Sequence, residues 1–166
     1  MVFTAAMAFS AVTLATNYTW NSAGGGNWDD TTASGWNTGG AYPNAQGDGA
    51  TFSQNIGADQ TMAINVGNAR LGSLTLQDAG STYYGWKLSG TNSLTFDVSA
   101  GSAGIVVQSS GGGPVDTHAI SAPIVCSAPL VVSLAMNGRL AISGTNSGLN
   151  GGVRISGGGG RGYVRF

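Results

Sequence analysis

LSGTNSLTFDV, residues 88–98, carries the pattern that decides the fold of this chain. Leu94, Phe96 and Val98 alternate with polar residues along its second half. Successive side chains of a β-strand point to opposite faces, so this alternation predicts a strand with one buried and one solvent-facing side. The preceding SGTN is typical of a turn, because Gly, Asn and Ser tolerate the backbone conformations that turns require.

Further runs of strand length lie on either side of this one, between residues 61 and 156. Their starts recur at intervals of about 8 to 12 residues, which is typical of a β-sandwich, a barrel or a solenoid. The predicted strands are residues 61–66, 70–77, 82–88, 93–98, 104–108, 118–125, 130–136, 139–143 and 152–156.

The turn sequence also recurs, because LSGTNS at residues 88–93 and ISGTNS at residues 142–147 differ at one position only. Stacked coils produce such a recurrence, since turns at equivalent corners meet the same steric demand. Coincidence in a chain rich in Ser, Thr, Asn and Gly is the alternative. We predict an all-β, single-domain parallel β-helix or β-solenoid, with an antiparallel β-sandwich or jelly roll as the alternative.

The composition agrees with strands and argues against several classes of function. Charged residues make up 8% of the 166 residues, and all seven acidic residues are Asp. Helix surfaces usually carry Glu and Lys, whereas Gly, Ser, Thr and β-branched residues suit turns and strands. The net charge of -1 provides no field that would attract nucleic acid. The hydrophobic fraction of 42% predicts a packed core and not a disordered chain.

Residues 17–56 differ in composition from the predicted strands that follow. Trp20, Trp28 and Trp36 recur there at intervals of eight residues in loop-forming sequence. Large aromatic side chains can close the end of a core that repeated strands would leave exposed, so this segment is expected to be a cap. The alternative is a sugar-stacking platform, which would use Trp20, Trp28, Trp36 and Trp86. The predicted organisation is an apolar arm over 1–16, the cap over 17–56, a solenoid body over 57–156 and a Gly-rich linker and tail over 157–166.

The order YTW, GNW, GW, P and GDGATF in this segment resembles the opening of bacterial autotransporter-associated β-strand repeat proteins. That resemblance implies a right-handed parallel β-helix exported to the cell surface, with no shared catalytic signature. It covers about residues 17–156, as an opening module without the many further repeats of the family. The matching residues are Trp20, Trp28, Trp36, Pro43, Asp48, Ala50, Phe52, Leu71, Leu74, Leu76, Ile120 and Leu140.

Few residues in this sequence suggest chemistry. His118 is the sole histidine, and Asp116 would share its face of a strand. Such a pair can act as a general base or a ligand, but without a nucleophile or further ligands we interpret His118 as a surface strand residue. Cys126, the sole cysteine, lies in apolar sequence and is predicted to be a small buried side chain. No catalytic residue and no cofactor are predicted.

Calcium is the one metal that the aspartates suggest. Asp29, Asp30 and Asp48 could supply the hard oxygen ligands that this ion prefers. Asp48 stands in the sequence GDG, where Asp more often closes an Asx turn by accepting backbone hydrogen bonds. We therefore predict a turn at Asp48 and keep calcium as the alternative.

The first sixteen residues contain no charged side chain. They lack the positive start of a secretory signal and are too short to cross a bilayer, for which about 20 apolar residues are needed. Both faces of an extended chain would be apolar here, as in a strand buried on both sides. Such a strand could pair within its own subunit or complete the sheet of a neighbour, and the tail GYVRF could also dock elsewhere. The predicted subunit interface is Val2, Phe3, Ala5, Met7, Phe9, Val12, Leu14, Tyr163, Val164 and Phe166.

These patterns lead to one expected function and two alternatives. An uncapped coil offers unpaired backbone groups to another chain, so we expect an extracellular or cell-surface structural subunit that assembles with copies of itself into a filament or sheath. The first alternative is an adhesin or carbohydrate-binding module whose partners are surface glycans. The second is a fragment of a polysaccharide-degrading enzyme.

Overall fold

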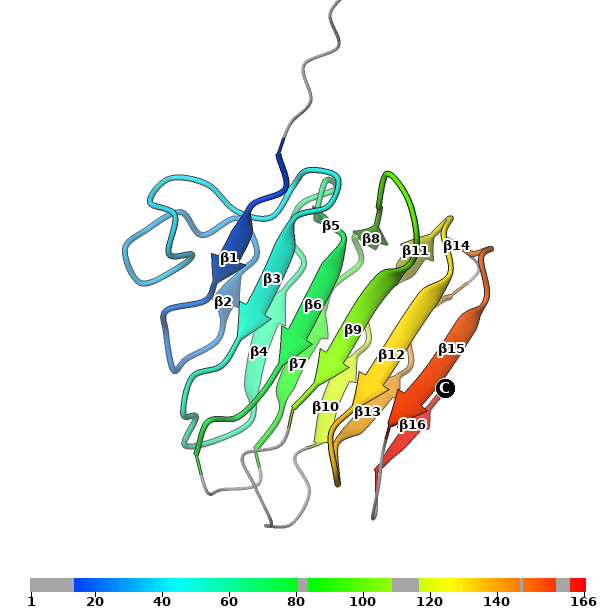
Figure 1. Ribbon diagram of the computed structural model, residues 1–166. Helices are drawn as coiled ribbons and strands as arrows, with labels where there is room; N and C mark the ends of the chain where they lie inside the picture. The colour runs from blue at the N-terminus through cyan, green and yellow to red at the C-terminus, as the bar shows by residue number, and fades with distance from the viewer. Residues whose placement is uncertain (1–13, 81–83, 109–116, 147, 158–161) are drawn as a thin grey trace, which may run out of the picture.

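A computed structural model describes residues 14–80, 84–108, 117–146, 148–157 and 162–166. Within these ranges the chain forms sixteen strands and no helix. The strands are short, from two to five residues, and they stack in layers from the first coil to the last (Figure 1). The chain is therefore an all-β protein.

The strands form three parallel sheets, which the chain visits in a repeating order. Sheet 1 contains β1 (Asn17–Thr19), β3 (Gly49–Phe52), β6 (Ser73–Leu76), β9 (Ala103–Val107), β12 (Leu130–Leu134) and β15 (Val153–Gly157). Sheet 2 contains β2 (Gly26–Asn27), β4 (Gln60–Ala63), β7 (Trp86–Ser89), β10 (Thr117–Ile120), β13 (Arg139–Ile142) and β16 (Tyr163–Arg165). Sheet 3 contains β5 (Arg70–Leu71), β8 (Leu94–Phe96), β11 (Ile124–Cys126) and β14 (Gly148–Leu149).

The order sheet 1, sheet 2, sheet 3 repeats through about four complete turns, with a partial turn at either end. All ladders between these strands are parallel, which confirms the predicted β-solenoid and excludes the antiparallel sandwich. Because each strand pairs with the strand one turn before and one turn after it, neighbouring coils bury each other's backbone groups.

The core consists of inward-facing rows that run along the axis of the solenoid. We call the row at the centre of sheet 1 the central ladder, and its members pair in register from strand to strand. It consists of Tyr18, Ala50, Leu74, Ile105, Val132 and Ile155. All of them are buried except Ile155, which is 48% exposed because β15 is the last strand of the sheet.

The recurring turn sequence has a structural explanation at one corner of the solenoid. Leu88 and Ile142 both pair with Ile120, so the two SGTN turns lie at the same corner, two turns apart. Their glycines permit close stacking, because a Cβ atom at Gly90 would lie 2.6 Å from the carbonyl oxygen of Ile64. Gly90 also has a φ of +142°, which few other residues adopt. The recurrence therefore reflects the spacing of the coils.

Both ends of the described chain belong to the same solenoid. Residues 17–56, expected as a cap, contribute β1, β2 and β3 to sheets 1 and 2. At the other end, Tyr163–Arg165 pairs with β13 of its own chain, and Val164 packs against the core (Figure 1). This part of the tail is thus the last strand of sheet 2, which differs from the expectation that it would dock elsewhere.

Candidate interface at the C-terminal end of the solenoid

The first turns of the solenoid are filled by an aromatic cluster. The rings of Trp28 and Trp36 have centroids 5.2 Å apart, and Trp36 contacts Phe52 at 5.4 Å. Phe52 in turn lies 5.1 Å from Trp86, one turn further along. These edge-on and tilted contacts are the arrangements that aromatic rings prefer. The eight-residue recurrence of tryptophan thus fills the core at this end.

Each of the four indole N–H groups also has a backbone acceptor inside the protein. Trp20 donates to Gly24 and Trp86 donates to Gln77, at 2.8 and 2.9 Å. Trp28 donates to Pro43 at 2.9 Å, and Trp36 donates to Trp28 at 2.6 Å. The four side chains are at most 1% exposed. The structure therefore places Trp20, Trp28, Trp36 and Trp86 in the core, and none of these rings offers a face on which a sugar could stack.

The loop between β2 and β3 also covers the outer edge of β1. The N–H of Asn37 donates to the carbonyl of Thr19 at 2.9 Å, and the Asn37 side chain accepts the N–H of Thr19 at 2.9 Å. The N–H of Asn21 donates to Gly35 at the same distance. Because these bonds use backbone groups that face away from β3, the outer edge of sheet 1 is covered at Thr19 and Asn21.

The opposite end has no such cover among the described residues. We define the C-terminal rim as β14, β15 and β16, which are the last strands of sheets 3, 1 and 2. Ile155 continues the central ladder and is 48% exposed, while Tyr163 and Phe166 are 44% and 61% exposed. The central ladder, which is fully buried at its four preceding positions, is thus half exposed at its last position, Ile155.

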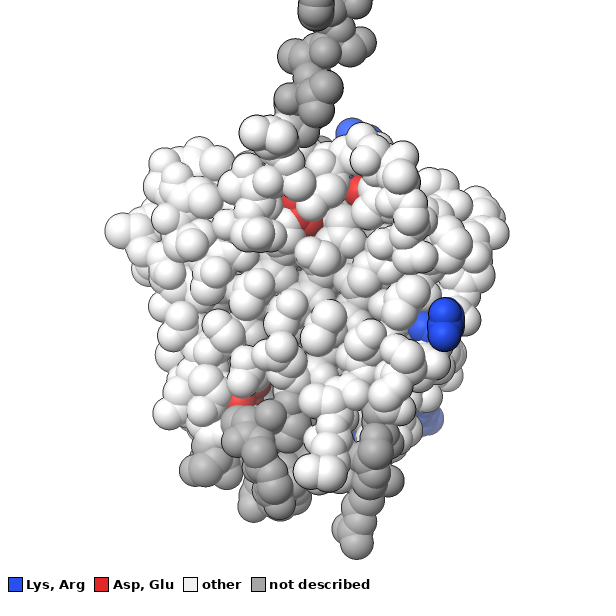
Figure 2. Space-filling model, in the orientation of Figure 1, with Lys and Arg blue, Asp and Glu red and all other residues white. Residues whose placement is uncertain are grey.

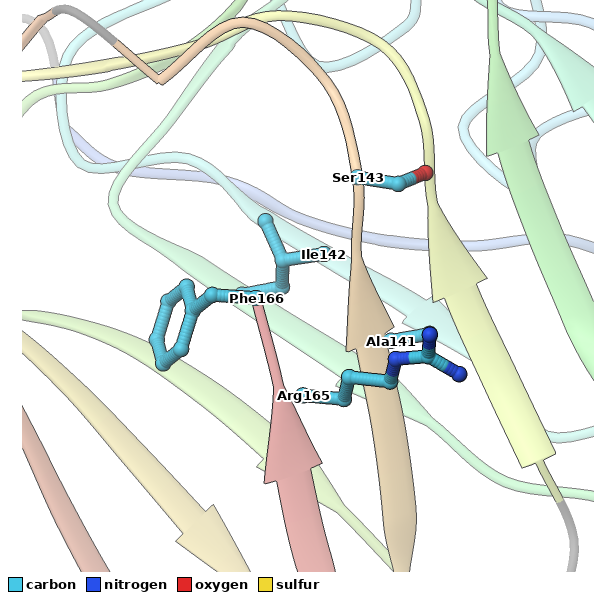
Figure 3. Close-up of a pocket in the computed structure, with 5 residues that line it drawn as sticks. All are labelled: Ala141, Ile142, Ser143, Arg165 and Phe166. Carbon is cyan, nitrogen blue, oxygen red and sulfur yellow. The ribbon is translucent and has the colours of Figure 1, made fainter.

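A shallow depression lies on this rim, beside the last residues of β16. It has a volume of about 260 Å³ and is lined by Ala141, Ile142, Ser143, Arg165 and Phe166. Figure 3 shows the ring of Phe166 next to Ile142, with the Arg165 side chain extending to the other side. One turn earlier at this corner the N–H of Ser143 donates to Ile120 at 2.9 Å.

The outer face of sheet 1 is nearly free of charge (Figure 2). Its central outward row consists of Thr19, Thr51, Thr75, Val106, Ser133 and Ser156. Two ion pairs lie elsewhere, between Arg70 and Asp97 and between Lys87 and Asp59. The strands of sheet 1 carry one charged residue, Arg154 in the last strand β15.

His118 differs from its prediction as a surface residue, because it is fully buried. It occupies an inward row of sheet 2, where it pairs with Leu140 in the ladder. Burial lowers the pKa of His118 to about 4, although the charges of Asp78 and Asp59 act in the opposite direction. The imidazole is therefore neutral near pH 7 and out of reach of a substrate. Its suggested partner Asp116 lies outside the described residues.

The three aspartates suggested for calcium lie in separate hydrogen-bonded settings. Asp48 accepts the N–H groups of Thr16, Asn44 and Ala45 at 2.9 to 3.2 Å. These donors all precede Asp48, whereas the predicted Asx turn would use the N–H two residues after it, so the carboxylate holds the preceding loop instead. Asp29 accepts the Asn65 side chain, and hydrogen bonds from the hydroxyl and N–H of Thr32 lower the pKa of Asp30. In the described part of the chain, no three His, Cys, Asp or Glu side chains are grouped as metal ligands.

Cys126 is buried as predicted, in the inward row of sheet 3 between Phe96 and Leu149. Its thiol donates a hydrogen bond to Ala128 at 3.0 Å, and burial raises the pKa of the thiol. A raised pKa keeps sulfur in the unreactive thiol form. Cys126 is thus part of the core.

Most of the predicted N-terminal interface lies outside the described residues, namely Val2, Phe3, Ala5, Met7, Phe9 and Val12. Leu14, the first described residue, is 86% exposed. The described residues form no helix with the length and apolar character needed to cross a membrane.

Comparison with protein-family models, curated proteins and solved structures finds no match to this chain. The site is therefore interpreted from its own geometry.

Proposed function

We propose that this protein is a non-catalytic, extracellular structural subunit, and that copies of it assemble head to tail into a filament or sheath. The observation that carries the proposal is the exposure of Ile155 at the end of an otherwise buried row. An unprotected last strand is a template for pairing with another chain, because its backbone donors and acceptors lack partners on one side.

The apolar content of the C-terminal rim adds to this argument. Ile155, Tyr163 and Phe166 are exposed on the last strands of sheets 1 and 2 or beside them. The charged side chains of these two strands are Arg154 in β15 and Arg165 in β16. Burying a large apolar side chain stabilises by about 1.5–3 kcal/mol when the burial is complete. A strand that covered these residues would therefore combine backbone hydrogen bonding with apolar contact.

The two ends of the solenoid are different, which favours an open assembly over a closed one. A contact between two unlike surfaces repeats from subunit to subunit unless its rotation closes a ring. The resemblance of the Trp-rich opening to exported autotransporter-associated β-strand repeat proteins supports the extracellular location.

The test is a charge placed on the last rung of the central ladder. Ile155→Lys would put an ammonium group in the surface that a partner must cover, so we expect it to abolish assembly in sedimentation velocity and negative-stain microscopy. Thr75→Lys is the matched control, because Thr75 faces outward from the middle of sheet 1. Wild-type protein that stays monomeric at every concentration would refute the proposal, as would unchanged assembly of Ile155→Lys.

A further inference from the structure

We infer that the partner of the C-terminal rim is residues 2–14 of a second copy of the chain, added as a strand alongside β15. This inference rests on the proposed function and goes beyond it by naming the segment that makes the contact.

The first step is that one solenoid cannot simply stack on the next. A subunit that approached the rim with its own first turn would present β1, where the N–H and C=O of Thr19 are already bonded to Asn37. The aromatic rings beneath that loop are buried and offer no apolar surface. At Thr19 the first strand of sheet 1 therefore lacks the free edge that the rim would require, which favours a contact from another part of the partner.

The second step is what the rim requires of a partner strand. Each preceding strand of sheet 1 covers its neighbour with an apolar side chain in the central ladder and a small uncharged side chain outside. A strand beside β15 must cover Ile155 on the inner face, and it must bring no charge into that row. All ladders of the sheet are parallel, so parallel pairing would continue the existing pattern.

The third step is that residues 2–14 meet this requirement in sequence and in reach. They contain no charged residue. An extended chain would place Phe3, Met7 and Phe9 on one face and Val2, Val12 and Leu14 on the other. Thirteen extended residues span at most about 43 Å, whereas the five residues of β15 need about 17 Å, so part of the segment remains as a tether.

The last step is the position from which the segment leaves its own solenoid. Thr16 is held by Asp48, whose carboxylate accepts its N–H at 2.9 Å. Two residues earlier, Leu14 is 86% exposed and has left the packed structure. The chain is thus anchored at one residue and directed into solvent immediately before it, as a segment that reaches another molecule must be.

The experiment compares full-length protein with a variant that lacks residues 2–14 and adds the missing segment back. A fluorescent peptide of residues 1–14 is titrated into the deletion variant, and binding is followed by anisotropy. We expect the deletion variant to be monomeric and to bind the peptide. Ile155→Lys in the same background should weaken peptide binding by about tenfold or more, whereas Thr75→Lys should not. Circular dichroism and tryptophan fluorescence report whether each variant is folded.

The outcomes separate this inference from the proposed function. If the deletion variant assembles as the full chain does while Ile155→Lys prevents assembly, the proposed function stands and the inference is wrong, because another surface covers the rim. Peptide binding that Ile155→Lys leaves unchanged also overturns the inference. If the full chain does not assemble, the proposed function fails, and the inference fails with it.

Discussion

The N–H of Trp86 donates a hydrogen bond to Nδ1 of His118, 3.1 Å away, across two neighbouring coils of the solenoid. Because Nδ1 accepts this bond, the proton of the neutral imidazole lies on Nε2. Nε2 is buried and has no hydrogen-bond partner among the described residues. A neutral ring is thus held in the core by one hydrogen bond, and a second proton on Nδ1 would deprive the N–H of Trp86 of its acceptor.

This arrangement predicts loss of stability in acid. In the unfolded chain His118 has an ordinary pKa of 6.5, and in the folded protein the value is about 4, so the unfolded state binds the proton first. The free energy of unfolding should fall as the pH drops from 6.5 to about 4, by a total of order 3 kcal/mol, and level off below that range. Urea denaturation across this pH range measures the effect.

The control for the acid effect is His118→Leu, which cannot titrate. Its stability at neutral pH should be lower, because the N–H of Trp86 loses its acceptor. Its stability should nevertheless change less with pH than that of the wild type, since His118 is the sole histidine. Equal pH dependence in both proteins would show that other groups cause the acid sensitivity.

A second prediction concerns the corner at which the SGTN turns stack. A Cβ atom at Gly144 would lie 2.3 Å from the carbonyl oxygen of Ala122 in the preceding coil. Gly144→Ala should therefore force the coils apart and lower the free energy of unfolding by about 1–3 kcal/mol. Gly57→Ala is the matched control, because a Cβ atom there would meet no atom within 4 Å. Similar thermal stability of the two variants would contradict the steric explanation.

A third prediction separates a structural from a ligand-binding role for the aromatic cluster. Trp36 is 1% exposed and contacts four other aromatic rings, three with centroids 5.2 to 5.4 Å away and one at 6.3 Å. Its indole N–H donates to the carbonyl of Trp28. Trp36→Ala should lower the free energy of unfolding by about 3–5 kcal/mol because it opens a cavity. Phe166→Ala, at a ring that is 61% exposed, should change the stability of the monomer by less than about 0.5 kcal/mol. A Trp36→Ala protein with wild-type stability would show that the ring is not part of the core.

The alternation of apolar residues was sufficient to predict most strands. Residues 93–98 contain β8, and Leu94 and Phe96 are buried as the pattern requires. The predicted strand at 70–77, however, contains β5 and β6, which belong to different sheets. The predicted strand at 118–125 likewise contains β10 and β11. Ala122 at the bend between them is fully buried, so the apolar sequence continues through the corner and local periodicity cannot reveal it.

The sequence signal for the candidate site was weaker than that for the fold. The tryptophans of residues 17–56 were evident in the sequence, but the strands among them were not predicted. β1 and β2 have only three and two residues, which is too short for a recognisable alternation. The burial of His118 also escaped prediction. Its place in the core depends on Trp86, 32 residues earlier, and no local pattern records that contact.

The sequence by itself determined that this chain forms stacked strands, because period-two alternation and recurring glycine turns are local properties of the backbone. Only the tertiary structure decided which end of the stack is closed. Asn37 covers Thr19 at one end, and at the other Ile155 ends a buried row with no cover from the described residues. The physical reason is that exposure of a strand edge depends on what lies beside it in space, and those neighbours come from distant parts of the chain.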